Sequence, residues 1–252
     1  MFAIVISKKE SFENGARAIL EVCHKAALDA KLVFLEEILL SQDFNNVSDI
    51  TAFYFLTNDP NLELYIEYFS RRGIFIANKK FYNFDRSKFS MQDRLRAGGV
   101  LVPPSVTAKD KLMLFSESGR IGFPCYVKSQ KQVSVVIEAV DKEELQRILH
   151  ETTESDIYLE KSVSTKSSVL KKFYFVSGGI YTKDKDEDEN FSIVMKPVLE
   201  SISNILQLDI FSADVFLENK GSYQCIDINP APGLFNSKLS RKKLAEYISS
   251  LS

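Results

Sequence analysis

The stretch of residues 226–233 has the spacing of a metal-binding strand that ends in a turn. Side chains along a strand alternate between the two faces of a sheet, so Asp227 and Asn229 point to one face while the isoleucines beside them point into a core. Pro230 and Pro232 cannot continue the ladder of hydrogen bonds, and the glycine at the end permits a tight turn. Two oxygen ligands are therefore predicted where a buried strand stops.

The strand before it supplies a third oxygen ligand. The apolar runs 211–217 and 223–229 read as the two strands of a hairpin. A turn centred between positions 220 and 221 places Asp214 directly opposite Asp227, with Cβ atoms about 5 Å apart. Like charges repel at that distance unless a cation lies between them, which predicts a divalent metal ion. The alternative is a pair of solvated carboxylates on an exposed face of the sheet.

The other reactive side chains restrict what this metal could do. The chain has two histidines, each on a predicted helix, and three cysteines far apart in apolar sequence. We therefore expect no histidine-based triad, zinc cluster or disulfide framework. The sequence also lacks the common glycine-rich nucleotide loops and the zinc protease motif. Phosphoryl transfer remains, because it needs mainly cations on phosphate oxygens, and Mg²⁺ takes one or two carboxylates and leaves room for phosphate and water.

Composition and charge are those of an ordinary soluble globular protein. Of its 252 residues, 45% are hydrophobic and 26% are charged, which suits one to three compact units. The net charge of -2 argues against nucleic acid or an anionic membrane as a partner. The N-terminal apolar run is too short for a signal peptide, and no stretch approaches the roughly 18 apolar residues of a membrane span. A cytoplasmic location is expected, and the sequence predicts no particular oligomeric state.

Apolar periodicity divides the chain into a small α/β part and a longer α+β part. In residues 1–84 it predicts strands at 2–6, 31–35, 52–56 and 73–77 and helices at 12–27 and 62–69. From residue 85 onward it predicts helices at 89–96, 142–149, 194–205 and 244–251, with strands at 125–128, 133–140, 157–160, 173–176, 180–182, 211–217 and 223–229. A further helix is predicted between the turn at 102–105 and Gly122. Gly98 and Gly99 are expected to end the helix at 89–96, and Asp141 to cap the helix at 142–149.

Two lysines have positions from which they could meet a phosphate. Lys128 ends the apolar strand that begins at Cys125, and Lys88 opens the helix that follows Asp85. Taken alone, each pattern favours an ordinary surface lysine. Their meaning depends on the order of the motifs around them.

That order resembles the ATP-grasp superfamily, and most closely its ribosomal-protein glutamate ligase-like branch of carboxylate-amine ligases. The motifs that carry the resemblance lie at 85–88, 102–104, 122–128, 157–163, 213–215 and 227–233. The resemblance implies an α/β (α+β) ATP-grasp fold with an N-terminal Rossmann-like pre-ATP-grasp domain over residues 1–84. ATP would be held between two α+β subdomains, one of residues 85–160 with the ATP lysines and one of residues 161–252 with the metal site.

The resemblance also implies which residues bind ATP. Lys88 and Lys128 would contact the phosphates, with Lys128 also near the adenine. Glu160, Lys161 and Val163 would form the hinge strand that reads adenine through backbone groups.

A metal site and a substrate site are implied as well. The metal ligands would be Asp214, Asp227 and Asn229, holding Mg²⁺ or, in its place, Mn²⁺. Lys172 would be the catalytic residue at the γ-phosphate, where the family commonly has an arginine. The implied substrate contacts are Lys171, Asn236 and Lys238.

Two departures from the family pattern bear on activity. The family has a glycine-rich loop after the second lysine that clamps the phosphates, whereas residues 129–132 are short and contain no glycine. The acidic residue before the family's arginine is also missing, because Leu170 and Lys171 stand there. The phosphates are therefore covered differently, or catalysis is slow or lost.

Three functions fit these residues. The first is an ADP-forming ligase that joins a carboxylate to an amine through an acyl phosphate, acting on an amino acid, a peptide or a small metabolite. It needs no nucleophile from the protein, which agrees with the scarcity of histidine. The second is a small-molecule kinase of the inositol polyphosphate type, which would need a denser basic pocket than this slightly acidic chain offers. The third is a nucleotide-binding module without turnover.

Overall fold

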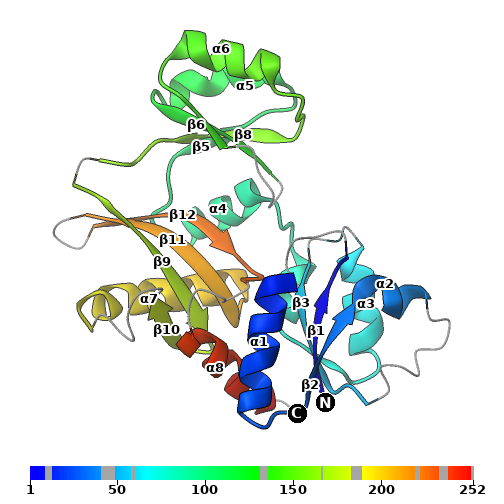
Figure 1. Ribbon diagram of the computed structural model, residues 1–252. Coiled ribbons are helices and arrows are strands. Elements are labelled where there is room, and N and C mark those ends of the chain that lie inside the picture. The colour runs from blue at the N-terminus through cyan, green and yellow to red at the C-terminus, as the bar shows by residue number, and fades with distance from the viewer. Residues whose placement is uncertain are drawn as a thin grey trace. The chain divides into compact units, whose positions relative to one another are not determined.

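The strands of this computed structural model, within the residues that it describes, form three four-stranded sheets (Figure 1). The described residues are 1–8, 13–40, 49–57, 59, 61–130, 136–165, 167–182, 189–218, 222–232 and 238–250. The chain groups into one compact unit of residues 1–84, 172–213 and 229–252 and another of residues 85–171 and 214–228. The three-domain division expected from the family stays a prediction.

The first compact unit begins with a parallel sheet built from continuous apolar runs. In the order β2-β1-β3-β4, its strands are β2 (Ala30–Phe34), β1 (Phe2–Ile6), β3 (Ala52–Leu56) and β4 (Phe75–Ile76). Because β1 and β3 are buried along their whole length, every position is apolar and none alternates. The helices are α1 (Glu13–Lys25), α2 (Leu35–Leu40), α3 (Leu62–Ser70) and the 3-10 helix η2 (Lys79–Asn83). All these strands lie within two residues of their predicted bounds, whereas α2 and η2 are too short for periodicity to predict.

The same unit continues in the second half of the chain. The sheet β10-β9-β11-β12 contains β9 (Val169–Val176), β10 (Gly179–Thr182), β11 (Ile210–Leu217) and β12 (Tyr223–Asn229). The helices are α7 (Glu189–Leu206) and α8 (Lys238–Ser249). The strands β9, β11 and β12 each pass from one unit into the other. The predicted hairpin of residues 173–182 is confirmed, because β9 and β10 pair antiparallel with Val176 opposite Gly179.

One apolar core joins the N-terminal sheet to the end of the chain. It contains Ile4 and Tyr54 from the parallel sheet, Ile19 from α1, Ile210 from β11 and Leu244 from α8, each at most 1% exposed. Helices α1 and α8 lie side by side, as Figure 1 shows. Residues 1–84 therefore share their core with the later segments of the same unit.

The second unit is an antiparallel sheet with two helices on one face (Figure 1). In the order β5-β8-β6-β7, its strands are β5 (Ser105–Thr107), β8 (Ile157–Lys161), β6 (Cys125–Ser129) and β7 (Val136–Ala139). Its helices are α4 (Lys88–Ala97), α5 (Lys111–Glu117), the 3-10 helix η3 (Ser118–Arg120) and α6 (Lys142–Glu151). Asp141 caps α6 as predicted, since its Oδ1 accepts the Glu144 amide at 2.8 Å. Of the elements of this unit, β5 and η3 are missing from the prediction, and each is three residues long.

The predicted turn between β11 and β12 includes residues 219–221, which lie outside the described part of the chain. The Glu218 amide donates to the Ser222 carbonyl at 2.9 Å, a pairing that a turn centred between positions 220 and 221 would not make. A shift of strand pairing by one residue would change which residues face each other across the two strands. The direct opposition of Asp214 and Asp227 therefore stays a prediction. At its other end β12 stops at Asn229, as the following proline requires.

None of the described helices is both long and apolar enough to cross a membrane.

Candidate functional site

The first turn of α4 is held by the strand β6. Ser87 begins the helix, because its hydroxyl accepts the Ser90 amide at 3.3 Å. The first two amides of the helix have no partner within the helix, and Gln130, directly after β6, accepts hydrogen bonds from both. The Lys88 amide donates to the Gln130 carbonyl at 3.3 Å, and the Phe89 amide donates to Gln130 Oε1 at 3.2 Å. The position of Lys88 is therefore fixed by the strand that also carries Lys128.

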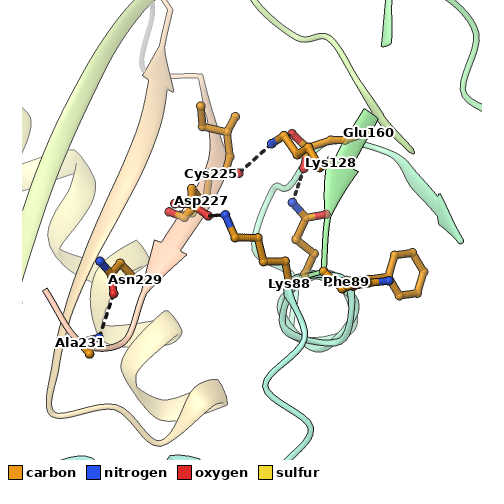
Figure 2. Close-up of polar contacts among 11 residues, drawn as sticks. Lys88, Phe89, Lys128, Glu160, Cys225, Asp227, Asn229 and Ala231 are labelled. Carbon is orange, nitrogen blue, oxygen red and sulfur yellow. Dashed lines mark hydrogen bonds and ion pairs between the residues drawn. The ribbon is translucent and has the colours of Figure 1, made fainter. Parts of the chain in front are cut away.

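Lys88 points across to β12 and forms an ion pair with Asp227 (Figure 2). Its Nζ lies 3.2 Å from Asp227 Oδ1, with the two side chains 12% and 36% exposed. The pair holds a cation and an anion together at a place where the sequence predicts a phosphate contact and a metal ligand. In this structure the two charges neutralise each other.

Lys128 forms a second, more deeply buried ion pair. Its Nζ donates to one oxygen of the Glu160 carboxylate and, at 3.4 Å, to the Ile226 carbonyl of β12, while Gln92 Nε2 donates to the other Glu160 oxygen (Figure 2). Lys128 is 8% exposed and Glu160 2%. Burial raises the pKa of Glu160, and the Lys128 charge and the Gln92 hydrogen bond act against that rise. The lysine and the glutamine together keep a buried carboxylate satisfied.

The two predicted metal carboxylates act on the same buried thiol. Burial raises the pKa of Cys225, and the charges of Asp227 and then Asp214 raise it further. Among the described residues there is no group of three or more His, Cys, Asp or Glu side chains that could hold a metal. A metal here would need further oxygens, which Asn229, phosphate and water can supply, and this donor set suits Mg²⁺.

A narrow pocket separates α4 from β12. Lys88, Gln92 and Asp227 are among its lining residues, and its space of about 10 Å³ is room for roughly one water molecule. Gln92 Oε1 is buried and has no hydrogen-bond partner among the described residues. A single ordered water in the pocket would satisfy that oxygen.

The structure places the remaining predicted residues as follows. Lys161 ends β8, where its amide donates to the Pro104 carbonyl at 2.8 Å and its Nζ to the Phe123 carbonyl at 2.6 Å. Val163 follows β8 and is half-buried. Lys171 and Lys172 are half-buried on β9. Asn236, the side chain of Lys238, residues 131 and 132 of the short stretch after Lys128, and residues 133–135 at the start of the predicted strand 133–140 lie outside the described part of the chain.

Sequence reasoning missed two glutamines that organise this site. Gln92 has a detectable signal, because it lies four residues after Lys88 and residues with that spacing share one face of a helix. Gln130 has none, because its contact with Phe89 joins residues 41 positions apart on different elements.

The three thiols are expected to resist modification in the folded protein. Burial raises the pKa of Cys23 and of Cys125 to about 11. With such a pKa, about one thiol in a thousand is ionised at pH 8, and the reaction rate should climb as the pH rises toward 11. Reaction with Ellman's reagent at pH 8 should be slow before unfolding and complete for all three thiols in urea. Rapid labelling of the folded protein would contradict this arrangement.

The comparisons with known proteins give the fold. A scan against protein-family models and a search of curated proteins found no match. A RimK domain ATP-grasp protein from Sphaerobacter thermophilus DSM 20745 matches at 13% identity and a TM-score of 0.73, over 98% of this chain and 99% of that one. A D-alanine–D-alanine ligase from Bacillus anthracis matches at 14% identity and a TM-score of 0.75, over 99% of this chain and 96% of that one, and a structure of the same ligase complexed with ATP also matches.

A third similar structure is the ATP-grasp ligase PsnB with its minimal precursor, Mg and ADP. It matches at 11% identity and a TM-score of 0.72, over 100% of this chain and 97% of that one. The chain therefore has the ATP-grasp fold, as its motif order predicts. Identities this low establish the fold and leave the reaction to be argued from the site.

Proposed function

We propose that this protein is an ATP-dependent ligase that joins a carboxylate to an amine and releases ADP and phosphate. The substrates would be an amino acid, a peptide or a small metabolite. The observation that carries the proposal is the gathering, in one compact unit, of two lysines and of carboxylates suited to Mg²⁺. Lys88 lies against Asp227, and Lys128 bridges Glu160 to the same strand.

This charge pattern suits a bound nucleotide better than it suits the free protein. A phosphate oxygen can replace Asp227 as the partner of Lys88, while Mg²⁺ can replace Lys88 beside Asp227. Such an exchange keeps Lys88 and Asp227 paired when Mg-ATP enters, and Lys128 can meet a phosphate oxygen while it still compensates the buried Glu160 carboxylate. The ATP and Mg–ADP complexes of the similar structures support ATP and Mg²⁺ as the ligands of this chain.

The reaction needs no nucleophile from the protein. A substrate carboxylate oxygen attacks the γ-phosphorus, the bond from that phosphorus to the bridging oxygen breaks, and ADP leaves. The amine then attacks the carbonyl carbon of the acyl phosphate, phosphate leaves with the bonding electrons, and the amine proton passes to solvent. Mg²⁺, when bound, neutralises charge on the phosphate oxygens.

The residues of the chain would bind and orient the reactants. Lys88 and Lys128 would hold phosphate oxygens, and Lys172 would meet the γ-phosphate during transfer. Asp214, Asp227 and Asn229 would bind the metal. The hinge strand of Glu160, Lys161 and Val163 would position the adenine, and Lys171, Asn236 and Lys238 would face the carboxylate or the amine.

An assay with hydroxylamine tests the proposal. Hydroxylamine captures acyl phosphates as hydroxamates, so the protein is incubated with Mg-ATP, pools of amino acids and peptides, and hydroxylamine, while ADP is followed. ADP with hydroxamate supports the ligase. ADP with a phosphorylated hydroxyl and no hydroxamate indicates a kinase, and ATP binding without ADP indicates a module without turnover; either result overturns the proposal.

A further inference from the structure

Asn78 uses its side-chain amide to connect the ends of two strands. Its Nδ2 donates to the Ile210 carbonyl at 2.6 Å and to the Pro230 carbonyl at 2.8 Å. Its Oδ1 accepts the amides of Asp209 and Ile210 at 2.8 and 2.9 Å. Ile210 is the first residue of β11, and Pro230 follows the last residue of β12. The amide thus ties the start of one strand to the end of the other.

The conformation of Asn78 is unusual and serves these contacts. Its φ of 59° lies in the left-handed region, which a residue other than glycine adopts at some cost, although asparagine tolerates it best. The side chain is 2% exposed, so every lost hydrogen bond would leave a buried polar group unpaired. The four side-chain hydrogen bonds of Asn78 offset the strain of its backbone conformation. Strained residues that their surroundings hold in place in this way are common at functional sites.

Tyr54, on strand β3, holds the turn of residues 230–232 that follows β12. Its hydroxyl donates to the Pro232 carbonyl at 2.8 Å, and the side chain is 1% exposed. Within the turn, the Ala231 amide donates to Asn229 Oδ1 at 2.9 Å (Figure 2). The backbone from Pro230 to Pro232 is therefore held at each residue, and the side chain of Asn229 is held by that backbone.

We propose that Asn78 and Tyr54 are positioning residues that orient Asn229 for the metal. The inference rests on the proposed function, because it requires Asn229 to bind Mg²⁺. Both residues belong to the N-terminal 84 residues and neither was implied by the motif order. Through Asn229 they give residues 1–84 an indirect role in binding the metal, because they hold the turn that ends the metal-binding strand.

The sharpest test is Tyr54→Phe, which keeps the ring in the core and removes only the hydrogen bond to Pro232. The control is Tyr65→Phe, the same change on the partly exposed face of α3. Calorimetry would give the ADP affinity of each protein with Mg²⁺ and with excess EDTA. We expect Tyr54→Phe to weaken ADP binding about tenfold with Mg²⁺, the low end for residues that orient a metal ligand, and to leave the value in EDTA unchanged.

A second variant, Asn78→Asp, removes the two amide donors and places an acceptor against two carbonyls. It should reduce the gain in ADP affinity from Mg²⁺ by more than tenfold and also lower the melting temperature. Its control is Asn83→Asp, at the exposed end of η2.

The outcomes separate this inference from the proposed function. If wild-type protein gains no ADP affinity from Mg²⁺, the metal-assisted function itself fails. If wild-type protein gains affinity and Tyr54→Phe matches Tyr65→Phe, the positioning role is overturned and the function stands. An equal loss by Tyr54→Phe with and without Mg²⁺ would also overturn it, because a general packing defect does not discriminate between the two conditions.

Discussion

Replacing Asp227 with asparagine is expected to lower ATP turnover by about a thousandfold while tightening the binding of metal-free ATP. The first effect follows from losing a charged Mg²⁺ ligand, and a thousandfold corresponds to about 4 kcal/mol of transition-state stabilisation. The second follows from the ion pair with Lys88 at 3.2 Å. An asparagine cannot hold the lysine as firmly, so Lys88 becomes available to phosphate.

The gain in metal-free affinity should be small. The Lys88–Asp227 pair is partly exposed on the aspartate side, and such pairs contribute about 1 kcal/mol or less, so a tightening of roughly threefold to fivefold is expected. Calorimetry with ATP in EDTA measures it, and ADP release under Mg²⁺ measures turnover. Asp93→Asn on the exposed surface of α4 is the matched control. Within the described residues, Arg96 is the ion-pair partner of the Asp93 carboxylate, and this pair lies away from β12 in the sequence and on the surface. Unchanged turnover in Asp227→Asn would remove Asp227 from the metal site.

Lys128→Met is expected to destabilise the protein and to abolish nucleotide binding. Removing the cation leaves the Glu160 carboxylate buried without its partner, and breaking a buried pair in this way costs about 3–5 kcal/mol. The loss of stability should depend on pH. Burial raises the pKa of Glu160, so the folded state binds a proton at this carboxylate more tightly than the unfolded state does. Protonation of Glu160 therefore stabilises the folded state at low pH. This stabilisation is lost as the pH rises through the raised pKa. The defect of Lys128→Met in urea unfolding should therefore be smaller at low pH than at neutral pH.

A double variant separates the structural role of Lys128 from its role toward phosphate. In Lys128→Met/Glu160→Gln both charges are removed, so most of the lost stability at neutral pH should return, while ATP affinity should not. Lys109→Met, which changes an exposed lysine of the same unit, should alter neither property. If the double variant bound ATP as wild type does, Lys128 would have no contact with the phosphates.

The structure confirms those parts of the fold that depend on local sequence. Continuous apolar runs gave β1 and β3 their bounds, and the proline after Asn229 ended β12 where expected. These features depend on residues close together in the chain, where alternation, capping and the missing amide of proline act directly. Short elements such as β5 and α2 carry too few residues for a period to be read.

The sequence by itself predicted the chemical types of the candidate site, which are two lysines and carboxylates at the end of a buried strand. Only the tertiary structure decided which of these groups meet. Gln92 and Glu160 are 68 positions apart, and Asn78 and Pro230 are 152 apart. Contacts of this kind depend on the order and register of strands across whole sheets, and no local pattern records them. The types of residue could therefore be predicted from the chain, but which residues pair came from the fold.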